Sequence, residues 1–99
     1  MNLRIISGIY GNRTIKALDT GVTHPMGERV RSSLFNIIGD VVKDAEVLDA
    51  FAGSGSLGLE ALSRGAKHAT FVERDRRAGQ TLAGNIKTLG ADDKSTIST

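Results

Sequence analysis

The chain has 99 residues and a formal net charge of +2, with thirteen Lys or Arg against eleven Asp or Glu. This length allows one small domain, and a hydrophobic fraction of 39% is ordinary for a globular chain. Because cysteine is absent, disulfide frameworks and thiolate metal sites are excluded. No apolar run approaches the roughly 20 residues of a membrane span, and polar residues interrupt the N-terminus. We therefore expect no membrane anchor, no signal peptide and a cytoplasmic location.

The N-terminal residues are expected to form a β-hairpin over residues 3–18. Residues 3–10 are rich in isoleucine, and Gly11-Asn12 suits a two-residue turn because both residues tolerate positive φ. A loop is expected to follow over residues 19–27.

After this loop the pattern predicts a helix and then alternating strands and helices. The helix, over residues 28–39, has an apolar stripe with helical spacing at Val30, Leu34, Ile37 and Ile38. Strands are then expected over residues 47–51, 68–73 and 95–99, and helices over residues 56–64 and 75–89. This order indicates an α/β fold, an open parallel sheet with helices on its faces. Since a doubly wound sheet usually has five or more strands, we expect the front half of a larger domain.

The last expected helix has clear end signals and a weak interior. Asp75 can cap its first turn, and Gly90 can end it. Gly79 and Gly84 inside it each cost about 1 kcal/mol relative to alanine. The strand after it leaves an open sheet edge, which favours pairing with another copy of the chain.

The most informative segment is the glycine-rich stretch over residues 49–58, between an expected strand and an expected helix. Gly53, Gly55 and Gly58 fit the pattern G-x-G-x-x-G. Glycines let a ligand approach the backbone closely, and the next helix points its free N–H groups at that ligand. Glu73, at the end of the following strand, can accept hydrogen bonds from two ribose hydroxyls.

Two nucleotide-like ligands fit this pattern, a dinucleotide and S-adenosylmethionine, and Asp49 favours the second. An anionic side chain beside the glycines disfavours a pyrophosphate, whereas it suits a cationic amino group and a sulfonium. Asp49 can also cap backbone amides of its own turn, and the two roles are compatible. The ring of Phe51 belongs either to the core or to the wall of the ligand site.

The stretch VLDAFAGSGSLGLEALSRGA, residues 47–66, resembles the first motif of the ribosomal RNA small-subunit methyltransferase D family, below called the methyltransferase D family. Further similarity lies in RIISG (residues 4–8), ERVRSSLFNI (residues 28–37) and FVERD (residues 71–75), and in all it covers nearly all of residues 3–90. The resemblance implies a Rossmann-like, S-adenosylmethionine-dependent enzyme. It would methylate the N2 amino group of a guanine in small-subunit (16S) ribosomal RNA.

By this resemblance, five positions line the cofactor site: Asp49, Phe51, Gly53, Gly55 and Glu73. The family's catalytic Asn/Asp-Pro-Pro-aromatic motif is absent, since the only proline is Pro25. No catalytic residue is therefore assigned, and the chain alone is expected not to transfer methyl groups. His24 replaces the arginine of the family's Arg-Pro-Thr motif. Neither His24 nor His68 has partners at metal-ligand spacing, so no metal is expected.

Residues 1–27 are expected to be an RNA-binding appendage, and residues 28–99 the N-terminal half of the cofactor-binding domain. Arg4, Arg13 and Lys16 are the candidate contacts to ribosomal RNA in the small subunit. A hairpin that only covers a sheet edge is the alternative. Three other functions stay open: an adenine-N6 nucleic-acid methyltransferase of the same fold, an NAD-binding Rossmann protein, and a non-catalytic RNA-binding fragment.

Overall fold

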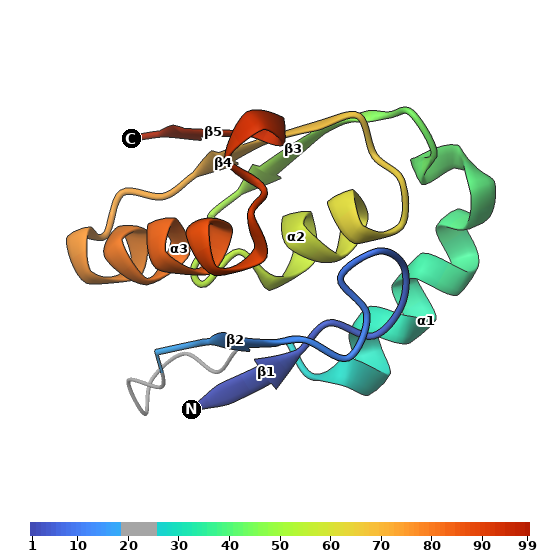
Figure 1. The fold of residues 1–99 in the computed structure, drawn as a ribbon, viewed down its shortest axis with the longest axis horizontal. Coiled ribbons are helices and arrows are strands. Elements are labelled where there is room, and N and C mark those ends of the chain that lie inside the picture. Colours follow the sequence, from blue (N-terminus) through green and yellow to red (C-terminus); the bar gives the residue numbers. More distant parts are fainter. Residues whose placement is uncertain (19–25) are drawn as a thin grey trace.

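The computed structural model describes residues 1–18 and 26–99 and has an α/β fold. Its strands and helices are, in chain order, β1 Asn2–Arg4, β2 Thr14–Lys16, α1 Glu28–Ile38, β3 Glu46–Ala50, α2 Ser56–Ser63, β4 His68–Val72, α3 Arg76–Leu89 and β5 Ser95–Ser98. Short 3₁₀ turns follow α1 and precede β5. The elements form three layers: a three-stranded sheet, then α2 and α3, then the two-stranded hairpin (Figure 1).

The larger sheet is parallel, with strand order β3-β4-β5. Because the order advances in one direction, two right-handed crossovers place α2 and α3 on the same face. In the described part of the chain, α2 and α3 thus cover one face of the parallel sheet, and the predicted α/β fold is confirmed. Leu48 pairs in register with Thr70 on the other face and is 68% exposed, so β3 is buried on one side only.

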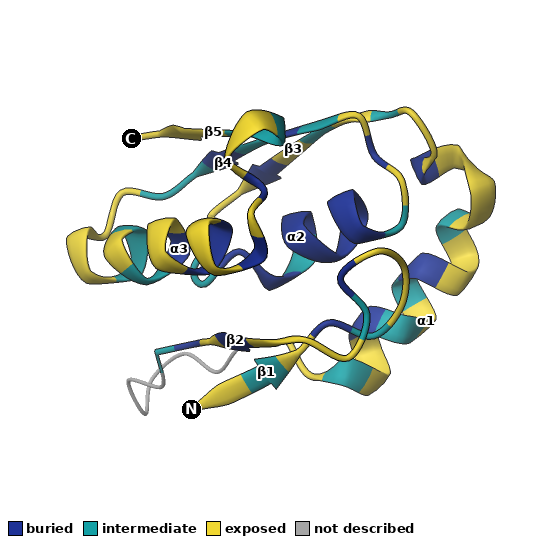
Figure 2. Cartoon of the chain, in the orientation of Figure 1, coloured by how far each residue is buried: buried dark blue, intermediate teal, exposed yellow. Residues whose placement is uncertain are grey.

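The core lies between the layers, and α2 is its centre (Figure 2). Every residue of α2 except Leu57 is buried. This happens because the sheet covers one side of the helix and the N-terminal segment covers the other. Phe71, from the middle strand, and Leu82, from α3, are fully buried against it. A helix enclosed on both sides need not be amphipathic.

The hairpin is confirmed, but its strands are shorter than predicted. Its register pairs Leu3 with Ile15, and β1 ends at Arg4 rather than at Tyr10. The two-residue turn is wrong, because residues 6–10 form a longer connection that docks on α2. Their backbone donates to this helix, with the Tyr10 N–H 2.9 Å from Ser63 Oγ.

A second correction concerns α1, because its predicted stripe faces the core only in part: Ile38 packs against the core and Leu34 is half-buried. Val30 is 58% exposed and Ile37 is 84% exposed, whereas Arg31 and Phe35 are buried. The helix is rotated toward charged residues of α2. The guanidinium of Arg64 stacks over the Phe35 ring, 4.8 Å from its centroid.

The last helix forms with both predicted end signals. Asp75 Oδ2 accepts the Ala78 N–H at 2.8 Å, and Gly90 takes the left-handed conformation with φ 69°. The parallel strand expected after it is also present. Of the expected loop over residues 19–27, only Met26 and Gly27 lie among the described residues, so His24 and Pro25 lie outside them. None of the described helices is long and apolar enough to cross a membrane.

Candidate cofactor site

A cavity of about 640 Å³ lies beside the C-terminal ends of β3 and β4. Open α/β sheets bind ligands at this edge. Its walls come from the residues that follow β2, the end of β3 and the glycine loop after it, the turn after β4, and the first half of α3. They comprise Ala17, Leu18, Met26, Asp49, Ala50, Phe51, Ala52, Gly53, Ser54, Ser56, Leu57, Glu73, Asp75, Ala78 and Thr81. Four of the five predicted cofactor residues are in this wall, and Gly55 is not.

The glycines of the motif have different roles. Gly53 has φ 57° and nothing within 4 Å of the position of a Cβ, so it leaves the cavity side open to a ligand. Gly55 has φ 86°, and a Cβ there would lie 2.3 Å from Leu82 Cδ1. Gly55 is therefore required by the turn and by packing.

Asp49 lies at the end of β3 and is only 6% exposed. Its Oδ2 accepts the Gly58 N–H at 3.0 Å, which confirms the predicted capping role. Burial raises the pKa of Asp49, the hydrogen bond from Gly58 opposes this rise, and the charge of Glu73 adds to it. A buried carboxylate with a raised pKa next to a cavity favours a cationic ligand group, since that group would stabilise its ionised form.

Glu73 joins the end of β4 to the glycine loop. Its Oε1 accepts the Gly53 N–H at 2.7 Å, and its Oε2 accepts the Asp75 N–H at 2.8 Å. Each carboxylate oxygen has a second lone pair. Glu73 can therefore hold the loop in place and still accept hydrogen bonds from a ligand in the cavity.

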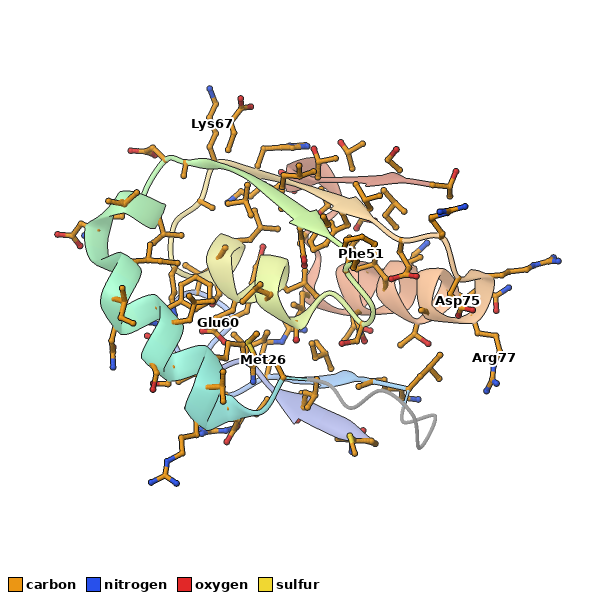
Figure 3. All side chains as sticks on the ribbon, turned by 180° about the vertical axis from the view of Figure 1, so that it is seen from behind. Met26, Phe51, Glu60, Lys67, Asp75 and Arg77 are labelled. Atoms are coloured by element: carbon orange, nitrogen blue, oxygen red, sulfur yellow. The ribbon has the colours of Figure 1, made fainter. Side chains whose placement is uncertain are left out.

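Phe51 combines backbone strain with exposure. Its φ is 61°, a left-handed conformation that is rare for an aromatic residue, and its side chain is 89% exposed. The ring therefore does not belong to the core. It stands at the end of β3 at the rim of the cavity (Figure 3). Strained residues of this kind cluster at ligand sites.

The three predicted RNA contacts have different surroundings. Arg4 is paired with Glu28, with Nε 2.7 Å from Oε1. Arg13 donates to the carbonyl of Thr88 at 2.6 Å, at the end of α3. Lys16 lines a groove between β2 and α3. Arg4 and Arg13 thus already stabilise the position of the hairpin.

Glu60 is a buried charged residue to which the sequence analysis assigned no role. It is 0% exposed and lies on the side of α2 that the N-terminal segment covers (Figure 3). Its carboxylate accepts the backbone N–H of Ile6 at 2.9 Å and of Ser7 at 3.1 Å, and it pairs with Arg64 Nε at 2.9 Å. Arg31, also 0% exposed, has its Nη1 3.7 Å from Glu60 Oε1.

Asn85 is a second residue without an assigned role. Its Oδ1 accepts the Lys16 N–H, and its Nδ2 donates to the carbonyls of Lys16 and Ser54. One side chain of α3 thus holds β2 and the glycine loop together. Within residues 1–18 and 26–99 no three His, Cys, Asp or Glu side chains are grouped to hold a metal ion.

A protein-family model described as "Conserved hypothetical protein 95" matches residues 3–99. Ribosomal RNA small subunit methyltransferase D of Escherichia coli strain K12 is 48% identical over 89 residues, 90% of this chain and 45% of that protein. The chain belongs to the methyltransferase D family. The protein of the same name from Haemophilus influenzae is 45% identical over 87 residues, 88% of this chain and 45% of that protein. The chain spans about half the length of these curated relatives.

Solved structures agree with this assignment to the methyltransferase D family. The Escherichia coli protein yhhF, described as a methyltransferase, superposes with a TM-score of 0.87 at 44% identity, over 98% of this chain and 51% of that chain. Thermus thermophilus protein TTHA0928 superposes with a TM-score of 0.82 at 31% identity, over 96% of this chain and 53% of that one. The Rossmann-like methyltransferase fold that the family resemblance implies is confirmed.

Proposed function

We propose that this chain binds S-adenosylmethionine in the cavity beside the glycine loop. We further propose that the protein methylates the N2 amino group of a guanine in small-subunit ribosomal RNA. The observation that carries the proposal is the joint position of Asp49, Phe51, Gly53 and Glu73 on one cavity wall. The names of the relatives support the RNA substrate.

The described residues fit this cofactor chemically. Glu73 suits two ribose hydroxyls, because a carboxylate accepts both and discriminates against a phosphate there. Asp49 suits the cationic amino group, and Gly53 leaves room for close approach to the backbone. The cofactor supplies a methyl group already activated on a sulfonium. The contribution of this chain is to bind and orient it, since such transfer depends mainly on positioning.

The division of labour along the chain is part of the proposal. Residues 28–99 form the cofactor-binding half, and residues 1–27 form the RNA-binding appendage. Asn85 supports this arrangement because it hydrogen-bonds β2 and the glycine loop at once. An RNA contact on the hairpin would therefore be held at a fixed distance from the cofactor.

Nucleoside analysis of RNA tests the acceptor. Immature small ribosomal subunits are incubated with methyl-labelled S-adenosylmethionine and a protein in which this chain is extended to the length of its curated relatives, and the RNA is then digested. The proposal expects label in N2-methylguanosine. Label in N6-methyladenosine would contradict the guanine acceptor, and saturable binding of NAD without binding of S-adenosylhomocysteine would contradict the cofactor.

A further inference from the structure

A groove of about 590 Å³ runs between the hairpin and α3. Strands β1 and β2 form one wall and the exposed side of α3 forms the other. Its lining residues include two cations, Lys16 and Arg77, together with the hydroxyl and amide side chains of Asn2, Thr14, Gln80, Thr81 and Thr88. Among the described residues that line it, none is acidic.

This composition is that of a phosphate-binding surface. Lysine and arginine neutralise phosphates, and hydroxyl and amide side chains donate to phosphate and sugar oxygens. Within residues 1–18 and 26–99, no hydrogen bond or salt bridge engages the side chain of Lys16 or Arg77, in contrast to Arg4, which Glu28 neutralises. The phosphates of a nucleic-acid strand in the groove would neutralise the charges of these two side chains.

Gly84 provides an independent observation. It lies in the interior of α3, where glycine costs about 1 kcal/mol relative to alanine, and it lines the groove. Packing does not require it, since a Cβ there would meet nothing within 4 Å and no positive φ is found. A glycine that the fold does not need, on the wall of a cationic groove, leaves space for close approach of a ligand to the helix backbone.

The groove is connected to the cofactor cavity. Leu18 and Thr81 line both hollows. Asn85 lines the groove and hydrogen-bonds the carbonyl of Ser54 in the glycine loop at 2.8 Å. A strand lying in the groove would therefore reach the mouth of the cavity along a wall that is held in register with the glycine loop.

We propose that this groove binds a single strand of the RNA substrate through its phosphates. Lys16 and Arg77 neutralise the phosphates, and Gly84 admits the strand to the surface of α3. The inference rests on the proposed function, because it takes RNA as the substrate. The main RNA-contact surface would then be the space between the hairpin and α3 and not the hairpin alone.

Two glycines of α3 make a matched test. Gly79 is also in the helix interior with nothing within 4 Å of a Cβ, but it does not line the groove. Gly84→Gln and Gly79→Gln should therefore both raise the melting temperature, since glutamine is a better helix former. Binding of a fluorescein-labelled 12-nucleotide single-stranded RNA should weaken at least tenfold in Gly84→Gln and stay unchanged in Gly79→Gln.

Substitution of the two cations gives a second test of the groove. Lys16→Ala and Arg77→Ala should each reduce the slope of log affinity against log salt by about 0.7, the value for one phosphate contact on a single strand. Lys67→Ala is the control, because Lys67 lies on the opposite side of the molecule from Arg77 (Figure 3). The same variants should bind S-adenosylhomocysteine like the wild-type chain.

The outcomes separate this inference from the proposed function. Equal RNA affinity of Gly84→Gln and Gly79→Gln would contradict RNA binding in the groove, as would unchanged salt slopes for Lys16→Ala and Arg77→Ala. In either case, RNA binding by the wild-type chain would still support the proposed function. Tighter binding of an RNA duplex that Gly84→Gln does not weaken would also contradict RNA binding in the groove. A wild-type chain that binds S-adenosylhomocysteine but no RNA would overturn both the groove and the RNA-binding role of this half.

Discussion

Glu73 and Gly53 are joined by a hydrogen bond of 2.7 Å from the glycine N–H to Oε1 of the carboxylate. The bond connects the end of β4 to the loop after β3, twenty residues earlier in the chain. The acid at the end of the second strand therefore shapes the glycine loop as well as facing the cavity. Its substitution should affect the loop and the ligand together.

Glu73→Ala should lower the affinity for S-adenosylhomocysteine at least tenfold. It removes two acceptors for ribose hydroxyls, each worth about 1.5–3 kcal/mol for a charged acceptor. It also releases the Gly53 N–H. Calorimetric titration measures the loss. Glu73→Gln is the matched variant, since it keeps one acceptor oxygen for Gly53. Full affinity in Glu73→Ala would remove Glu73 from the site.

Asp49→Asn should weaken the binding of S-adenosylhomocysteine, and it should leave the free energy of unfolding of the free chain unchanged or raise it. Burial raises the pKa of Asp49 above its ordinary value, so the ionised carboxylate costs stability in the free protein. This cost is absent at low pH and is fully present above the raised pKa. The melting temperature of Asp49→Asn relative to wild type should therefore rise as pH increases through this range. A higher melting temperature of Asp49→Asn only at acid pH would contradict the predicted direction of the pKa shift.

Phe51→Asn should stabilise the free chain and weaken ligand binding. Asparagine tolerates the left-handed conformation that costs other residues about 1–2 kcal/mol, and an 89% exposed ring loses little packing. A gain of 1 kcal/mol corresponds to roughly 4–8 °C in a domain of this size. Phe51→Tyr keeps an aromatic ring and should retain affinity. A lower melting temperature for Phe51→Asn would show that the ring packs after all.

Glu60→Ala should destabilise the fold by about 3–5 kcal/mol, because it leaves Arg31 as an uncompensated buried charge. It also removes the acceptor for Ile6 and Ser7. Urea unfolding measures the change. Glu46→Ala, on the exposed end of β3, serves as the control and should change stability by less than about 0.5 kcal/mol. Similar midpoints for the two variants would contradict the role of Glu60.

Local signals in the sequence predicted the parallel sheet, α3 and the glycine turn. Asp75 and Gly90 mark the ends of α3 through contacts a few residues away, so their residue types suffice. The missed features depend on partners far along the chain. Just after the first strand, Ser7 donates to Glu60, 53 residues later, so the backbone turns toward α2 instead of continuing the strand. No hydrophobic pattern contains that information.

The error in α1 has the same origin. The apolar stripe predicts the inward face only in part, and the fully buried position on this face is Arg31, because Glu60 on α2 lies opposite it. A buried arginine is tolerated only with such a partner. For the site, residue types indicated Asp49 and Glu73. The strain at Phe51 and the bridging role of Asn85 required the three-dimensional arrangement.

The most direct test of the central claim is a titration of the ¹⁵N-labelled chain with S-adenosylhomocysteine, followed by amide chemical shifts. The account predicts saturable shifts at the glycine loop and at the turn after β4, including Gly53, whose N–H donates to Glu73, and Asp75. Parallel titration with NAD should leave these amides unchanged. Saturable shifts with NAD and none with S-adenosylhomocysteine would contradict the account.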